Sequence, residues 1–245
     1  SFGGFVFVNS DQRKVFSINL STFTFGQKEA DIRYVGFNPG FTWRPTDYFS
    51  LTASSQIRII HDTWMPWIDY ESSEDQQTGD ERFIVATLDQ TTVGTTLRFD
   101  LTLTPDLTIQ FYGSPYLDAG IFSEDKLVVA PKAGAFTERY HTFTAEERDW
   151  DGNPNTYDYD VDGGHDGVIN FEVPEDRDFN YKQFNANLVL RWEYQTGSAV
   201  YLVWSNNLSH SVDVGDFDFA RDMKQLLKSS GENVFMIKAS YLLNI

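Results

Sequence analysis

The acidic stretch from 149 to 167, DWDGNPNTYDYDVDGGHDG, combines metal-binding residue types with a metal-binding spacing. Its centre reads DYDVDG, which resembles the start of an EF-hand calcium loop: alternate carboxylates converge on the ion and the glycine permits a sharp turn. The twelfth position of such a loop should be a bidentate glutamate, but here it is Ile169. A solvated acidic surface loop is therefore the alternative. The residues that would bind calcium are Asp158, Asp160, Asp162 and Asp166.

Signs of catalysis are few. The chain has four histidines but no His-Glu-x-x-His pair and no Gly-x-Ser-x-Gly elbow. His165-Asp166 or Ser209-His210 could belong to a hydrolase site, yet both are also ordinary loop composition. We therefore name no catalytic residue, and a surface hydrolase stays the third hypothesis for the function.

Aromatic side chains gather in the run TWMPWIDY, residues 63–70. Because planar rings stack on sugars, Trp64, Trp67 and Tyr70 are candidate glycan contacts. The same residue types form girdles at membrane–water interfaces, which is the alternative role for this run. Other aromatic residues expected near strand ends, and so in such a girdle, are Tyr48, Phe49, Tyr116 and Trp204.

Composition limits the classes of partner and of membrane segment. The formal charge of -17, from 36 acidic and 19 basic residues, disfavours nucleic acid, whose phosphates would be repelled. No cysteine is present, so there is no disulfide framework and no thiolate site. Mean hydropathy is -0.38 and no apolar run reaches about 18 residues, so no transmembrane helix is expected. Membrane β-barrels have such compositions because only alternate residues contact lipid.

Alternation of apolar and polar residues predicts long strands. In NANLVLRWEYQTGSAVYLVWSNN, residues 185–207, every second side chain from Leu188 to Tyr194 is apolar, while Arg191 and Glu193 lie on the other face. Most predicted strands have ten or more residues, the length that a tilted strand needs to cross a bilayer, whereas strands of globular proteins average about five or six. The predicted strands are 13–25, 33–44, 48–60, 82–104, 107–117, 185–195, 199–209 and 233–245, with 2–8 as a weaker ninth.

The connections differ sharply in length. Those at 45–47, 104–106 and 195–198 are minimal, and they fall at the opposite end of the sheet from the long acidic ones, which are 61–81, 118–184 and 210–232. Outer-membrane barrels have short periplasmic turns and long external loops, whereas a β-sandwich mixes lengths at both ends. The predicted fold is thus an all-β antiparallel transmembrane β-barrel, or the C-terminal part of a larger one. It forms a single domain over 1–245, and a soluble β-sandwich that binds glycans is the alternative.

Charged residues recur on the polar face of these strands. If that face lines the lumen of a barrel, the charges either select a passing solute or form ion pairs that fill a narrow barrel. Both signs occur close together, which favours ion pairs. The predicted lumen charges are Arg44, Arg58, Arg98, Asp100, Arg191, Glu193 and Lys238.

Three runs carry a family resemblance: DFNYKQFNANLVLRWEYQTGSAVYLVWSNN, TTLRFDLTLTPDLTIQFYGSPYLDAG and the closing ENVFMIKASYLLNI. They are similar to the C-terminal barrel family catalogued as domain of unknown function 5916. Arg191 to Tyr194, with Val203-Trp204, is the most specific block, and the resemblance covers most of the chain from about residue 80. The resemblance implies a Bacteroidetes-type envelope protein, often with a domain similar to family 9 carbohydrate-binding modules in front of the barrel. It implies no reaction.

The expected location is therefore the bacterial outer membrane, with a role in transport, anchoring or assembly. Expected partners are outer-membrane lipid, a missing N-terminal part of the same protein or other envelope proteins, and glycans; calcium is the one cofactor considered. Nine strands break the even-number rule of barrels. Either 2–8 is a plug and eight strands close, or earlier strands are missing, which we favour. Direct pairing of 13–25 with 233–245 would support the closed barrel.

Overall fold

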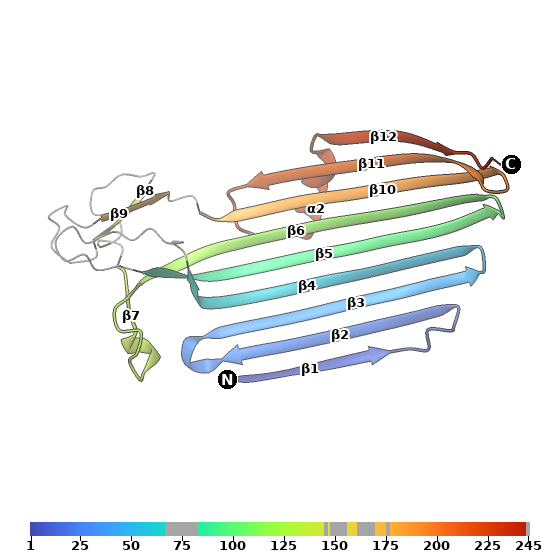
Figure 1. Ribbon diagram of the computed structural model, residues 1–245. Helices are drawn as coiled ribbons and strands as arrows, with labels where there is room; N and C mark the ends of the chain where they lie inside the picture. Colours follow the sequence, from blue (N-terminus) through green and yellow to red (C-terminus); the bar gives the residue numbers. More distant parts are fainter. Residues whose placement is uncertain (67–82, 145–146, 148–155, 161–169, 175–176, 244–245) are drawn as a thin grey trace.

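The computed structural model describes the chain except for a few segments, and shows one large, twisted antiparallel sheet with its strands side by side (Figure 1). The long strands all run between the same two ends. The described residues are 1–66, 83–144, 147, 156–160, 170–174 and 177–243.

Nine long strands make up the sheet in the order β1-β2-β3-β4-β5-β6-β10-β11-β12, and every neighbouring pair is antiparallel. Their bounds are β1 Phe2–Asn9, β2 Phe16–Gln27, β3 Ile32–Thr46, β4 Phe49–Pro66, β5 Ile84–Thr104, β6 Leu107–Val128, β10 Phe179–Gln195, β11 Ser198–Val212 and β12 Gly231–Ser240.

Smaller elements lie in the connections. The short strand β7, Tyr140–Thr142, extends the sheet by pairing with the end of β6, and β8, Thr156–Asp160, pairs with β9, Asn170–Pro174, as a separate ribbon. Two 3-10 turns, Lys28–Ala30 and Phe136–Glu138, and one helix, α2 at Phe219–Lys228, complete the described elements.

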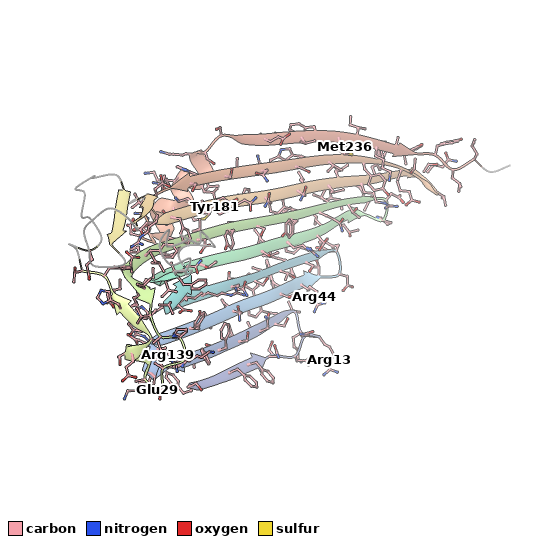
Figure 2. The ribbon with its side chains drawn as sticks, turned by 60° about the vertical axis from the view of Figure 1, so that its left-hand side comes forward. Arg13, Glu29, Arg44, Arg139, Tyr181 and Met236 are labelled. Atoms are coloured by element: carbon pink, nitrogen blue, oxygen red, sulfur yellow. The ribbon has the colours of Figure 1, made fainter. Side chains whose placement is uncertain are left out.

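The two ends of the sheet differ. At the turn end, β3–β4, β5–β6 and β10–β11 are joined by two-residue turns, and Gly197 supplies the positive φ of 77° that the last of these needs. At the loop end lie the long connections after β4, β6 and β11. Figure 2 shows Arg13 and Arg44 at the turn end, and Glu29 and Arg139 at the loop end. The predicted asymmetry of connections is confirmed.

The sheet is open within the described residues. β1 pairs only with β2, and β12 pairs only with β11, so both edges are free. The segment 13–25 does not pair with 233–245, and residues 2–9 form a regular strand of the sheet, not a plug. A closed eight-strand barrel is therefore excluded for the described arrangement.

Several predicted boundaries need correction. β6 continues to Val128 and β10 begins at Phe179, so the predicted loop 118–184 starts and ends with strand. The apolar alternation stops near Asp118, but backbone pairing with β5 and β10 continues past it. Pairing, not side-chain pattern, sets the length of these strands. Bulges between Asp62 and Met65 in β4 and between Val85 and Thr87 in β5 accompany their extension.

The helix α2 lies inside the stretch 210–232, which was predicted as a loop. The Asp218 side chain caps it by accepting a hydrogen bond from the Arg221 N–H at 2.7 Å. The signal was present in the sequence: Phe219, Met223 and Leu226 follow the cap at helical spacing. Among the described residues, no helix is long and apolar enough to cross a membrane.

Candidate functional site: one apolar and one polar face of the sheet

The registers assign each strand residue to one of two faces, because residues directly opposite each other share a face. Leu188 of β10 lies opposite Phe111 of β6 on one side and Trp204 of β11 on the other. The same face continues through Phe99 of β5 and Leu51 of β4. We call this surface the apolar face; its large members include Phe16, Ile18, Phe37, Phe41, Trp43, Phe49, Leu51, Ile57, Leu97, Phe99, Leu101, Ile109, Phe111, Leu188, Leu190, Trp192, Leu202, Trp204, Phe235 and Ile237.

These large side chains of the apolar face are half-buried or exposed, and none of them is buried. Trp192 retains 51% of its accessible surface, Leu202 44% and Phe235 77%. Soluble monomers rarely expose contiguous apolar patches larger than a few hundred Å². The face is therefore a candidate contact surface for lipid or for a protein partner.

Polar side chains that fall on the apolar face contact one another. The hydroxyls of Ser55 and Thr95 lie 2.9 Å apart across β4 and β5. The indole N–H of Trp204 donates to Asn233 Oδ1 at 2.9 Å, and the Asn206 amide donates to the same oxygen at 3.1 Å. These polar groups therefore satisfy one another's hydrogen bonds within the apolar face.

The apolar residues of the apolar face form a band that ends at a defined level near the loop end. On β3, β4 and β5 the apolar face ends at Arg33, His61 and Asp89, which are opposite one another in register. The ring Nδ1 of His61 lies 2.7 Å from Asp89 Oδ1, and Arg33 Nε lies 3.5 Å from Asp31. On β4 the band runs from Phe49 to Ile59, ten residue steps, or about 33 Å along the strand. If the strand were tilted by about 40° to a membrane normal, this length would correspond to a height of about 25 Å.

The opposite surface, which we call the polar face, is joined across strands by side-chain hydrogen bonds. Asn207 donates to Asn185 Oδ1 at 2.7 Å, and Ser205 donates to Asn187 Oδ1 at 2.6 Å. On β6, Asp118 accepts hydrogen bonds at 2.8 Å from both Gln90 and Thr92. Tyr116 donates to the other oxygen of Asp118 at 3.2 Å, so it lies on the polar face, on the opposite side of the sheet from Trp204.

The registers of regular pairing place six of the seven predicted lumen charges on the polar face: Arg58, Arg98, Asp100, Arg191, Glu193 and Lys238. Arg191 forms an ion pair with Glu193 of the same strand. The Arg98 guanidinium lies 5.7 Å from the Tyr112 ring centroid, while Asp100 accepts a hydrogen bond from Gln110 at 3.0 Å. Lys238 Nζ lies 5.6 Å from the Tyr201 ring centroid.

Arg44 is the seventh of these charges and has a different position. It lies within the register shift between Trp43 and Thr46 near the end of β3, and its guanidinium donates to the carbonyl of Gln12 in the β1–β2 connection. It thus links two turns at the turn end. Arg44 and Asp100 also line a cavity of about 600 Å³ there, together with Arg13, Lys14 and Asp47.

The polar face becomes apolar toward the two free edges. Phe5 and Phe7 of β1, together with Phe23 of β2, lie on this side, and the rings of Phe5 and Phe7 stack with centroids 6.4 Å apart. On β12, Val234 and Met236 share it. The two-faced pattern is therefore clearer in the six long strands from β3 to β11 than in β1, β2 and β12.

At the loop end, buried charges connect the extended strand ends to the loops. Lys126 of β6 is buried, and its ammonium donates to Thr87 at 2.7 Å and lies 3.4 Å from Glu124. Asp125 accepts hydrogen bonds from both terminal nitrogens of Arg177. Each charge faces an opposite charge, as burial requires.

The helix α2 lies on the apolar face at the loop end of β10. Asn180 and Lys182, both even-numbered residues of β10, share the face of Leu188. Asn180 donates to Asp222 Oδ1 at 3.2 Å, and Lys182 Nζ lies 3.8 Å from the same oxygen; the side chains of Lys182 and Asp222 are fully buried. We call Asn180, Lys182, Arg221 and Asp222 the helix clasp.

The charge state of the helix clasp is set by its contacts. Burial raises the pKa of Asp222. Its carboxylate also accepts hydrogen bonds from Arg221, from the Asp218 backbone N–H and from Asn180, and these lower the pKa by more than burial raises it. The pKa of Asp222 therefore lies below its ordinary value. Asp222 thus stays ionised beside the Lys182 ammonium. The clasp was not predicted from the sequence, because its members are about forty residues apart and its helix was not expected.

The remaining predicted site residues are largely outside the described part of the chain. Asp158 and Asp160 lie in strand β8, while Asp162 and Asp166 are outside the described residues. Trp64 lies in β4, and Trp67 and Tyr70 are also outside. In the part of the chain that the structure describes, no group of three His, Asp or Glu residues is placed to hold a metal ion. The calcium and glycan sites stay predictions.

Comparison with known protein families identifies a match. The sequence model of the family described as "Domain of unknown function (DUF5916)" matches residues 1–245, the whole chain. A search of curated protein sequences found no match.

Proposed function

The chain belongs to the DUF5916 family, and from that premise we propose that its sheet is part of the wall of a β-barrel in the bacterial outer membrane. The apolar face contacts lipid and the polar face lines the interior. The observation that carries this proposal is the exposed apolar face, which runs across the sheet from β2 to β12 and is about as high as the hydrocarbon core spanned by outer-membrane barrels.

The pattern of polar groups supports the same assignment. Charged residues of the central strands lie on the polar face or at the loop end, and hydroxyl and amide groups on the apolar face contact each other. A lipid-facing surface needs both features because hydrocarbon offers no hydrogen bonds. Short turns at one end and long acidic connections at the other are also typical of such barrels, with the turns in the periplasm.

The directions of the strands constrain how such a barrel closes. Nine strands with antiparallel neighbours make β1 and β12 run in the same direction, from the loop end to the turn end. Joining them directly would create a parallel pair, and leaving them open in lipid would leave backbone groups unpaired. We propose that an odd number of further antiparallel strands, from the same protein or from an envelope partner, completes the barrel.

Within the envelope, this wall would serve transport, anchoring or assembly. The polar face carries both signs of charge and paired amides, so it suits a hydrated or plugged interior more than a single-ion filter. The long acidic connections would face the exterior.

Flotation tests this proposal. The protein is mixed with phospholipid in detergent, the detergent is removed, and the vesicles are floated on a density gradient and washed with alkaline carbonate. We expect the protein to float and to resist the wash, because the apolar face is then in contact with lipid. A protein that stays dispersed and monomeric after removal of detergent without lipid would overturn the proposal and favour a soluble sheet.

A further inference from the structure

We propose that α2 is an interfacial helix whose basic flank binds the phosphate-bearing headgroups of anionic lipids. This inference rests on the proposed function, since it requires the apolar face to contact a bilayer. The helix α2 lies in the connection between β11 and β12, outside the strands that form the apolar face.

The position of α2 is the first argument. The helix clasp holds it on the apolar face, at Asn180 and Lys182, just beyond the point where the apolar residues of β10 end with Phe184. On β3, β4 and β5 the band of apolar residues also ends at charged residues near the loop end. In a membrane-embedded sheet this level is where hydrocarbon meets headgroups.

The distribution of side chains around α2 is the second argument. Asp222 and Leu226 are buried against the sheet. At 100° per residue, Phe219, Met223 and Leu227 fall on one flank, and Phe219 and Leu227 are 55% and 61% exposed. Lys224 and Lys228, both exposed, fall on the other flank beside Arg221. A helix with one apolar and one Lys/Arg-rich flank is the type that lies in a membrane interface.

Charge is the third argument. The chain is strongly acidic overall, at -17, yet this helix of ten residues presents three cations to one side and only Asp222, which is buried. The Arg221 guanidinium is held by Asp216 at 2.6 Å and by Asp222 at 2.9 Å, so Lys224 and Lys228 provide the charges available to a ligand. Together with Ala220, Arg221 and Gln225 they line a depression of about 480 Å³.

Anionic lipid matches these features better than a free anion does. A headgroup phosphate would contact the basic flank while the acyl chains of the same molecule lie against Phe219 and Leu227. A free phosphate would use only the first of these contacts. Lipid binding should therefore depend on both flanks, and inorganic phosphate should compete weakly.

The test uses the full chain in detergent micelles, with a bimane label on Ser230→Cys, an exposed position after α2 that none of the proposed contacts uses; the chain has no cysteine of its own. Short-chain phosphatidylglycerol is titrated while bimane emission is recorded. We expect the double variant Lys224→Gln/Lys228→Gln to raise the midpoint of the titration roughly tenfold, because each lysine attracts anionic lipid. The charge-matched control Lys14→Gln/Lys132→Gln, at exposed sites away from α2, should leave the midpoint unchanged.

Three outcomes overturn the inference: equal midpoints for the double variant and the control, an equal response to short-chain phosphatidylcholine, or full competition by 10-fold excess inorganic phosphate. A flotation result separates this failure from that of the proposed function. If the protein floats but the midpoints are equal, only the inference about α2 is wrong. If the protein does not enter any bilayer, the premise itself has failed.

Discussion

Lys182 is the residue where the apolar face of β10 gives way to charge. Its side chain is completely buried, and its ammonium contacts Asp222 at 3.8 Å and the Asn180 carbonyl at 3.4 Å. Burying an ammonium without a partner is far more costly than burying a paired one. The helix clasp therefore both positions α2 and makes the position of α2 necessary for the stability of the sheet end.

Removing one partner of this pair should be more harmful than removing both. We expect Asp222→Leu to lower the free energy of unfolding by about 3–5 kcal/mol, since it leaves Lys182 buried and unpaired. Adding Lys182→Met should restore most of the loss. Denaturant unfolding in detergent micelles measures both. Asp216→Asn, which removes an exposed partner of Arg221, should cost less than about 1 kcal/mol. A double variant as unstable as Asp222→Leu would contradict the clasp.

Acid should release the helix. The pKa of Asp222 lies below its ordinary value, so its contribution is complete above the unfolded pKa of about 3.9 and is lost as the pH falls through the lower folded value. The charged groups that face Asp222 are Lys182 and Arg221, with Asp216 and Asp218 nearby. Bimane on Leu227→Cys should report constant docking from pH 7 to about 4 and release below it. The same label with Asp222→Asn should lack this transition; a shared transition would refute the assignment.

At the residue scale, the face of the strand on which a side chain lies was predictable from sequence. Contacts between side chains of distant elements were not. Alternation alone assigned Arg191, Glu193 and Lys238 to the polar side of their strands, which the registers bear out. Nothing in the alternation indicated that Lys182 meets Asp222, because that contact depends on where α2 folds back. The pattern likewise did not separate Tyr116 from lipid-facing aromatic residues.

At the element scale, strands with continuous alternation were predicted closely. The turns between β3 and β4, β5 and β6, and β10 and β11 fall at the predicted positions, since Pro, Asp and Gly mark them. The strand extensions beyond Ile60 and Leu117 were missed because their side chains are mixed. The helix was missed because its acidic surroundings suggested a loop, although Asp218 and the spacing from Phe219 to Leu226 carried a helix signal.

Adjacent residues of β10 offer a matched test of the two faces. Leu190 lies on the apolar face and Val189 on the polar face, next to each other in the middle of the band. In lipid, Leu190→Arg should cost about 2–4 kcal/mol of folding free energy, while Val189→Arg should have little effect because its charge points toward the polar interior. Unfolding from phospholipid vesicles by denaturant measures the difference. Equal costs, or a larger cost at Val189, would contradict the assignment of faces.

At the scale of the whole molecule, the two free edges of the sheet, β1 and β12, determine how a barrel could close. Strand order followed from sequence because consecutive strands pair, but the number of strands in the proposed barrel does not follow from a sheet with two open edges. β1 and β12 run in the same direction, so direct contact between them would be a parallel pair. An antiparallel barrel therefore requires further strands between β1 and β12.

Disulfide trapping in the native membrane tests this requirement. Leu202→Cys with Ile237→Cys places thiols on register partners of β11 and β12 and should cross-link readily. Val6→Cys with Ile237→Cys should not cross-link, because intervening strands separate β1 from β12. Efficient cross-linking of the second pair would show that the nine strands close on themselves.

The most direct measurement of the central claim is the environment of single residues along β10. Spin labels on cysteines placed one at a time from 188 to 193, in protein reconstituted into phospholipid vesicles, report collision with oxygen, which concentrates in lipid, and with a water-soluble nickel complex. Labels at Leu188, Leu190 and Trp192 should favour oxygen, and labels at Val189, Arg191 and Glu193 should favour nickel. A period of two in which every even position is lipid-exposed is the predicted result. Equal access of nickel to both sets would contradict the claim that this sheet was built to face lipid.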